Sequence, residues 1–424
     1  MMKPKTLEPN TVVIVDAART PIGLRDGILK AYTAPQLGGV VVRALLEKNK
    51  GVGPQDVDSV IMGNVVGAGL GQGPAKQAAV FGGLGYETAH TLVNTVCSSG
   101  LAAVVEGVKS ILLGDSEVVV AGGFESMTNA PYLIVPHSRK GERIGEAQGK
   151  RVALDPPDTD DPLAYKRLFS TLKVAGLLDA NAYDSLVCPF NRNKFMRDYA
   201  VSFAQQKGYT IDQVNEAASS SFEKAMVAQE SGAFDREIVP VDGASRDQIP
   251  PPAKQAQWLA NSNDFCSAYN GPFLADAGAA VLLTTASKVR ELGLSTMAYV
   301  TGYARVDTPP EGFVLAPVRA TKLLVDALAR AGYSTDFGLI EANESFGVQI
   351  PLFEEEFGQK IGIPRINVHG GATALGHPLG AAGARILTTL LYAMDRYGQQ
   401  RGIAAICFGG GGAFAMSVET APGR

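Results

Sequence analysis

Cysteine is scarce in this chain, and its spacing argues against a disulfide framework. Four cysteines occur among 424 residues, and no two of them form a Cys-x-x-Cys pair: Cys97, Cys188, Cys266 and Cys407. Scattered cysteines are typical of proteins from a reducing compartment rather than of secreted, disulfide-stabilised proteins. We therefore expect a cytoplasmic location.

Strong net charge and long apolar runs are also missing. The formal net charge is −4, so no overall basic balance favours nucleic acid as a partner. Residues 1–10 are polar and lack the apolar segment of a signal peptide. No uninterrupted apolar run approaches the roughly 20 residues that a membrane span needs. We expect no nucleic-acid partner and no membrane span.

Glycine and apolar residues are abundant instead, with 48 glycines and 46% hydrophobic residues. Buried strands alternate with helices along the chain, which predicts an α/β fold with a layered core. Expected strands cover 12–15, 57–66, 116–121, 298–304 and, as the last one, 402–408; expected helices cover 34–49, 74–81, 101–113, 320–331 and 380–397. Residues 16–23 are expected to form a loop, and glycines at 122 and 123 to close a strand. The second half repeats the order of elements of the first, which suggests a duplicated α/β unit.

The segment from 127 to 260 has a different composition, with more charge and proline. It holds one long helix-like run, 211–231, and few buried strands, so we interpret it as an insertion or lid over the core. Basic residues gather near its start: Arg139, Lys140, Arg143, Lys150 and Arg151. Such charges usually form a solvated face, and phosphate binding is the alternative.

Cys97 stands between a strand-like approach, 91–93, and an apolar helix-like run, 101–113. This position is beside the first free N–H groups of a helix, where partial positive charge stabilises a thiolate. The small residues that follow, Ser98, Ser99 and Gly100, leave room for a second group to approach. A nucleophilic cysteine is the hypothesis, and a buried structural cysteine is the alternative.

Three later stretches carry further reactive groups. Asn343 follows a strand, His377 lies in a loop before a helix, and Cys407 comes between an apolar strand and a glycine run. Together with Cys97 these groups suit acyl transfer, because a histidine can serve as base, a second cysteine can shuttle a proton, and glycine N–H groups can form an oxyanion hole. A zinc site formed by Cys97, His377 and Cys407 is conceivable, but no metal-ligand spacing supports it and we expect no metal.

With these stretches in this order, the chain resembles the thiolase family. The resemblance runs in register over about residues 11–418, in several independent blocks. These blocks are Asp-Ala-Ala-Arg-Thr-Pro-Ile-Gly at 16–23, Asn-Thr-Val-Cys-Ser-Ser-Gly at 94–100, Gly-Gly-Phe-Glu-Ser-Met at 122–127, Asn-Glu-Ser-Phe at 343–346, Gly-Gly-Ala-Thr-Ala-Leu-Gly-His-Pro at 370–378 and Cys-Phe-Gly-Gly-Gly at 407–411.

The resemblance implies a duplicated αβαβα layered fold with an inserted loop domain. The N-terminal half would comprise 11–126 and 261–292, the loop domain 127–260 and the C-terminal half 293–420. It also implies a homodimer or homotetramer that uses coenzyme A as co-substrate with no tightly bound cofactor, and a place in fatty acid metabolism and β-oxidation.

The mechanism that the resemblance implies is the cleavage of 3-oxoacyl-CoA by CoA to acetyl-CoA and a shortened acyl-CoA, or the reverse condensation. Cys97 would attack the carbonyl and become acylated, His377 would take its proton, and Cys407 would exchange a proton with the acetyl-CoA carbanion. One oxyanion hole would consist of His377 and a water held by Asn343. The other would consist of the N–H groups of Cys97 and Gly409.

Departures from the family pattern concentrate in the loop domain. Phe195-Met196-Arg197 stands where a His-Met-Gly stretch is common, and Phe273 ends a stretch where a CoA-contacting serine is usual. His369 stands where an asparagine is usual. The catalytic positions are kept while the pocket is rewritten, which suggests an unusual acyl group. We take Met196, Phe273 and Phe346 as the residues that contact CoA.

Two other functions remain open from the sequence. A ketoacyl synthase-like condensing enzyme would pair its cysteine with two histidines, or with a histidine and an asparagine. His369 keeps this alternative open, although Cys407 argues against it. A non-catalytic subunit that binds acyl-CoA would fit the altered loop domain but not the intact catalytic set.

Overall fold

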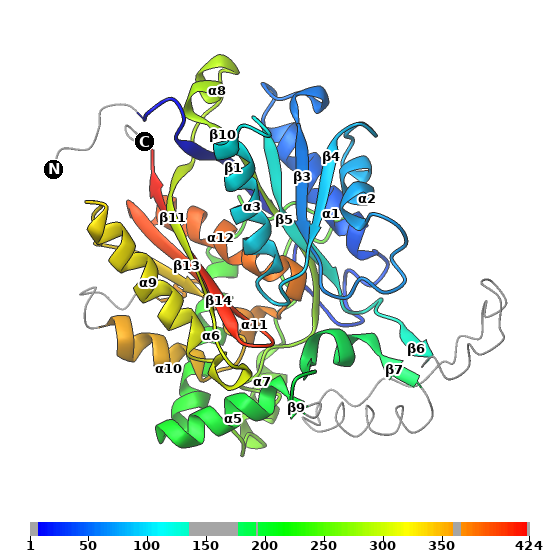
Figure 1. Cartoon of the computed structure of the whole chain (residues 1–424). Coiled ribbons are helices and arrows are strands. Elements are labelled where there is room, and N and C mark those ends of the chain that lie inside the picture. Colours follow the sequence, from blue (N-terminus) through cyan, green and yellow to red (C-terminus); the bar gives the residue numbers. More distant parts are fainter. Residues whose placement is uncertain (1–6, 135–176, 192–193, 359–365, 422–424) are drawn as a thin grey trace.

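The computed structural model describes residues 7–134, 177–191, 194–358 and 366–421. One large sheet runs through the molecule (Figure 1), and its strands lie in the order β12-β13-β14-β11-β1-β10-β5-β3-β4, with β2 paired to β10. The bounds are β1 Val12–Arg19, β2 Gly23–Leu24, β3 Ser59–Gly63, β4 Ala89–Val93, β5 Val119–Ser126, β10 Ala275–Thr285, β11 Ala298–Asp307, β12 Leu339–Ala342, β13 Arg401–Phe408 and β14 Gly412–Thr420.

Helices cover both faces of this sheet. The main ones are α1 Ala34–Lys48, α2 Pro74–Phe81, α3 Ser99–Leu113, α5 Met196–Lys207, α6 Ile211–Glu230, α7 Pro252–Ala260, α8 Ala286–Glu291, α9 Ala316–Arg330, α10 Gln349–Phe353, α11 Ala372–Leu375 and α12 Leu379–Arg396. Short strands β6 (Tyr132–Ile134) with β7 (Leu177–Asp179) and β8 (Val187–Cys188) with β9 (Lys194–Phe195) form two small ribbons.

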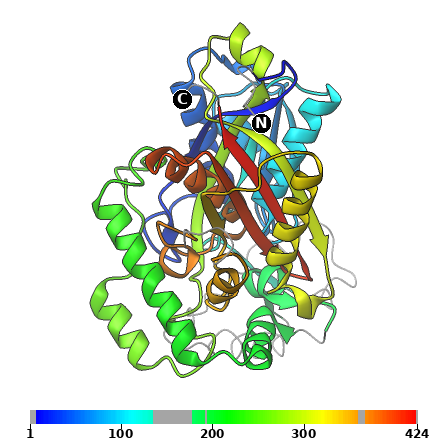
Figure 2. The same cartoon turned by 90° about the vertical axis from the view of Figure 1, so that its left-hand side faces the viewer.

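Five layers result from this arrangement. α3 and α12 pack on each other in the middle, α12 against both β10 and β13; α1 and α2 cover the outer face of one half of the sheet, and α9 covers the other half. The two halves join where β1 pairs with β11, at Val13 and Tyr299. The duplicated αβαβα layering expected from the sequence is therefore present. α5, α6 and α7, all from 196–260, gather on one side of this core (Figures 1 and 2).

The expected loop at 16–23 is wrong in its first half, because β1 continues to Arg19. The register shifts between Ile14 and Asp16, so a bulge accommodates the polar residue that suggested a loop. Arg19 pairs with Ala279 in the ladder. Its side chain is buried yet satisfied by two carboxylates, which local composition does not reveal.

The expected end of a strand at residue 121 is also wrong, since β5 continues through Gly122 and Gly123 to Ser126. A side chain at either glycine would collide with backbone: a Cβ on Gly122 would lie 2.1 Å from the Ala279 carbonyl oxygen, and one on Gly123 2.0 Å from that of Gly380. Glycine here permits close approach rather than a turn. The strand at 402–408 is likewise not the last, because the following glycines turn the chain into β14, antiparallel to β13.

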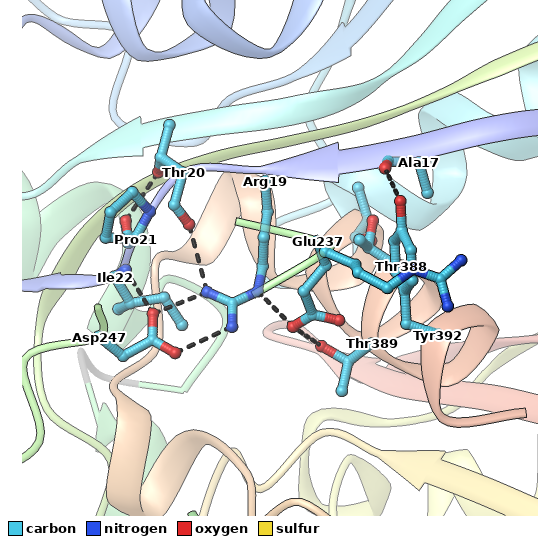
Figure 3. A network of polar contacts seen from close by, with 12 residues as sticks. Ala17, Arg19, Thr20, Pro21, Ile22, Glu237, Asp247, Thr388, Thr389 and Tyr392 are labelled. Carbon is cyan, nitrogen blue, oxygen red and sulfur yellow. Dashed lines mark hydrogen bonds and ion pairs between the residues drawn. The ribbon is translucent and has the colours of Figure 1, made fainter. Parts of the chain in front are cut away.

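A fully buried ion network ties the segment 237–247 to the core (Figure 3). The Arg19 guanidinium donates from Nη1 and Nη2 to the two oxygens of Asp247 at 2.7 and 2.9 Å, and from Nε to Glu237 Oε1 at 2.7 Å. Thr389 of α12 donates to the same Glu237 oxygen at 3.2 Å, and the Ile22 N–H donates to Asp247. The network thus joins β1, α12 and the segment 237–247.

Within the described ranges, one helical stretch, Val96–Leu113, is long and apolar enough to cross a membrane. It consists of the turn at Cys97 and α3, which the fold packs against α12, β3 and β5. We read it as a core helix, because such helices share this composition.

Candidate active site

A strained turn presents Cys97 just before α3. Val96 has a φ of 50°, in the left-handed region that branched side chains avoid. The turn is held by Ser99, whose hydroxyl donates to the Val96 carbonyl at 2.6 Å and accepts from the Thr95 N–H at 3.0 Å. Strain of this kind persists only where the surroundings impose it, which marks the turn as a functional feature.

The thiol of Cys97 is buried, and Cys407 from the other half of the chain lies near enough to affect its pKa. The backbone N–H groups of Gly409 and of Cys97 itself also lie near the Cys97 sulfur and lower the pKa of the thiol. Burial, and then the nearby Cys407, nevertheless raise the pKa of the Cys97 thiol well above its ordinary value. The expectation of a thiolate stabilised by the helix N-terminus is therefore wrong for the free enzyme, because desolvation outweighs the backbone donors.

His377 lies between α11 and α12 and faces Asn343. The Nδ2 of Asn343 lies 3.5 Å from Nε2 of His377, and the His377 N–H donates to the Phe273 carbonyl at 2.8 Å. Burial, with the charge of Arg385 as a second cause, lowers the pKa of His377 to about 3. The imidazole is therefore neutral at physiological pH and free to accept a proton.

Cys407 near the end of β13 contacts a residue that the sequence did not single out, Ser345. The Cys407 thiol donates to the Ser345 hydroxyl at 3.1 Å, and Asn343 Nδ2 donates to the same oxygen at 2.7 Å. Parallel pairing of β12 with β13 brings these residues together, since Ala342 lies opposite Ala405. The sequence feature that could have pointed to Ser345 is its place two positions after Asn343, a candidate catalytic residue.

Two buried carboxylates fix the histidine loop from both sides. Glu344 accepts from the Thr373 N–H at 3.0 Å, just before His377. Glu125 accepts from the Gly380 N–H at 2.9 Å, just after it, and also from the Val65 N–H at 3.0 Å. Burial raises the pKa of Glu125 to about 7. No local pattern around either glutamate selects it for this role.

The two central helices, α3 and α12, touch near their N-termini, just after Cys97 and His377. A Cβ on Gly100 would lie 2.8 Å from the carbonyl oxygen of Gly380 and 2.9 Å from the N of Ala384. Only glycine permits this approach, which brings the turn of Cys97 beside the loop of His377. The site thus gathers Cys97, His377, Asn343, Cys407 and Gly409, all five residues predicted as catalytic.

Comparison with known proteins agrees with this architecture. Models of the thiolase N-terminal domain and the thiolase C-terminal domain match residues 12–287 and 294–420. The acetyl-CoA acetyltransferase of Chromobacterium violaceum is 39% identical, with 96% of this chain and 99% of that protein covered, and the one of Escherichia coli is 36% identical over 96% and 98%. The crystal structure of the Bacillus anthracis acetyl-CoA acetyltransferase is 29% identical with a TM-score of 0.80, over 97% of this chain and 98% of that one.

The chain belongs to the thiolase family. Its function is that of an acyl-CoA thiolase, an acyltransferase that uses CoA as substrate. The ketoacyl synthase-like and non-catalytic alternatives are not favoured.

The three residues predicted to contact CoA in this thiolase lie in different surroundings. Met196 is buried at the start of α5, with its sulfur 3.8 Å from the place of a Cβ on Gly409. The ring of Phe273 packs on Trp258, with ring centres 5.0 Å apart, and so contacts α7. Phe346 meets Phe313 edge to face, with ring centres 5.8 Å apart. Met196 thus borders Gly409, and Phe273 contacts His377 through its carbonyl.

His369 takes no part in the thiolase site. Its buried ring lies between Phe234 and Tyr397, with ring centres 5.6 Å away in each case, and neither ring nitrogen has a hydrogen-bond partner among the described residues. In the part of the chain that the structure describes, no three His, Cys, Asp or Glu side chains group to hold a metal. The basic cluster at 139–151 lies outside the described residues.

Proposed function

We propose that this thiolase cleaves or forms 3-oxoacyl-CoA through an acyl-Cys97 intermediate. The observation that carries the proposal is the position of Gly409 beside the turn of Cys97: a Cβ on Gly409 would lie 3.3 Å from Val96 Cγ1, so the N–H groups of Gly409 and Cys97 lie near the Cys97 sulfur. When this sulfur attacks a carbonyl group, the carbonyl oxygen comes to lie beside the same N–H donors. They would then stabilise the developing oxyanion in a dry site, where such donors have their largest effect.

Acylation begins with proton transfer from the Cys97 thiol to His377. The neutral imidazole is the base, and its low pKa in the free enzyme is offset by the ion pair that it forms with the thiolate. The sulfur attacks the 3-oxo carbonyl, and the bond between C2 and C3 breaks. Cys407 gives its proton to the departing acetyl-CoA carbanion, whose enolate oxygen is bound by His377 and a water held by Asn343. His377 returns its proton to the Cys407 thiolate. It then takes the proton of the CoA thiol as the CoA sulfur attacks the acyl group, and it passes this proton to the Cys97 sulfur as that sulfur leaves.

The acyl group differs from that of the common family members in this proposal. The rewritten stretches at 195–201 and 270–273 support it. Phe195 and Phe273 stand there in place of small or polar residues, and their large rings would narrow or reshape the acyl pocket.

Thiolysis of 3-oxoacyl-CoA esters of increasing chain length, followed by loss of enolate absorbance, tests the reaction and ranks the substrates. Cys97→Ala should abolish acyl-enzyme formation, measured as the mass added to the intact protein. Cys266→Ala removes a buried thiol elsewhere and serves as the matched control. Acylation that survives Cys97→Ala would refute the assignment.

We further propose a homodimer or homotetramer in the cytoplasm that works in β-oxidation. β4 supports self-association: it lies at the edge of the sheet, and its residues 89–92 are exposed, Leu92 by 40%. The four cysteines support a reducing compartment, since all of them are free thiols. Sedimentation equilibrium and cell fractionation test these two points.

A further inference from the structure

Two polar side chains that the reaction scheme above leaves unused, Ser345 and Gln349, interact with Cys407. Ser345 is 4% exposed, and its hydroxyl oxygen lies 3.1 Å from the Cys407 sulfur. Gln349, the first residue of α10, is fully buried. Its Oε1 accepts from the Phe346 N–H at 3.2 Å, which orients the amide, and its Nε2 has no hydrogen-bond partner in the described part of the chain.

An unpaired buried N–H donor costs free energy, so the position of the Gln349 amide calls for an explanation. Both Ser345 and Gln349 lower the pKa of the Cys407 thiol, against the larger effect of burial, which raises it. The two side chains therefore interact more favourably with the thiolate of Cys407 than with its thiol. A negative sulfur would supply the acceptor that Gln349 Nε2 lacks.

We propose that Ser345 and Gln349 form a donor pair that stabilises the Cys407 thiolate during proton transfer to and from the α-carbon of acetyl-CoA. In condensation Cys407 first gives its proton to the neutral His377, and the Cys407 thiolate then takes the α-proton: the C–H bond breaks, the S–H bond forms, and the electron pair moves to the thioester oxygen as the enolate. The proton on His377 goes to the Cys97 sulfur when the enolate carbon attacks the acetyl group and that sulfur leaves. The Ser345 hydroxyl turns from donating to the thiolate to accepting from the new thiol, and Asn343 Nδ2 donates to it throughout.

This inference rests on the proposed role of Cys407. It predicts different effects of the same substitution on two half-reactions. Exchange of the acetyl group between acetyl-CoA and labelled CoA needs only Cys97 and His377. Condensation and thiolysis also need the Cys407 proton transfer. Loss of a hydrogen bond to a charged group should therefore slow carbon–carbon chemistry about tenfold to a hundredfold while acetyl exchange stays within about twofold.

The experiment compares Ser345→Ala, Ser345→Thr and Gln349→Leu with Cys407→Ala in both half-reactions. We expect Ser345→Ala and Gln349→Leu to lose condensation selectively and Ser345→Thr, which keeps the hydroxyl, to recover it. In a Cys97→Ala background, alkylation of the Cys407 peptide, followed by mass spectrometry, should shift to higher pH when either donor is removed.

Equal losses in both half-reactions, or an unchanged alkylation profile, would overturn the donor-pair proposal. A Cys407→Ala enzyme that still condenses acetyl-CoA would instead refute the assignment of Cys407. An inactive Cys407→Ala enzyme beside fully active Ser345→Ala and Gln349→Leu enzymes would refute the donor pair alone.

Discussion

Buried His369 should make the stability of this thiolase fall in mild acid by an amount that the structure sets. Desolvation, and then the positive charges of Arg396 and Arg19, lower its pKa from 6.5 to about 4. The unfolded chain therefore takes up the proton first as the pH falls. The contribution of neutral His369 to the free energy of unfolding is complete above pH 6.5. It decreases progressively below this pH and is gone near pH 4.

The size of the loss follows from proton linkage. With an unfolded pKa of 6.5 and a folded pKa of about 4, this one residue should cost about 0.8 kcal/mol at pH 6 and about 2 kcal/mol at pH 5, relative to pH 8. Other groups titrate over the same range, including His377. A matched variant is therefore needed to isolate the contribution of His369.

His369→Leu supplies that comparison, because it replaces an imidazole without hydrogen-bond partners by an apolar group of similar size. Urea unfolding of both proteins at equal protomer concentration, from pH 8 to pH 5, gives the difference in free energy of unfolding. We expect this difference to move in favour of the leucine variant by about 2 kcal/mol at pH 5. A difference constant over this range would show that His369 does not titrate as its burial requires.

Two further substitutions test how the core holds the site. Arg19→Met leaves the buried carboxylates of Glu237 and Asp247 without their cation, and the free energy of unfolding should fall by about 3–5 kcal/mol, measured by denaturant titration; a change below about 1 kcal/mol would contradict the role given to the network. Gly380→Ala forces a Cβ to within 2.6 Å of the Phe124 carbonyl oxygen. Thiolysis should fall more than stability, which should drop by about 1–3 kcal/mol, and an enzyme with unchanged kcat would show that the helix start tolerates displacement.

The elements that the sequence predicted well are those whose pattern is local. The helix at 74–81 has the predicted bounds, and the one at 211–231 ends one residue earlier, because proline at the first position of one and Thr210 as the N-cap of the other are local signals. The continuation of β1 and β5 depended on contacts made from far along the chain. Asp247 satisfies Arg19, and α12 approaches Gly123, and neither partner is visible in the local pattern.

The candidate site shows the same division. Cys97, His377 and Cys407 were recognisable because each is a reactive residue type at a turn. Ser345 was not, because its role comes from the parallel pairing of β12 with β13. The domain limits at 126, 260 and 292 stay predictions, although β10 pairs with both β1 and β5.

The raised thiol pKa values imply that this thiolase does not rest with charged sulfurs. Burial raises the pKa of both Cys97 and Cys407, and it lowers that of His377, so every proton stays on sulfur in the free enzyme. Substrate binding must therefore favour the charged state that is unstable in the free site. The oxyanion formed by attack of Cys97 does so, because it places negative charge beside N–H donors that are already in position. A cysteine that is inert toward alkylating agents at neutral pH but acylated rapidly by acyl-CoA is the behaviour that this arrangement requires.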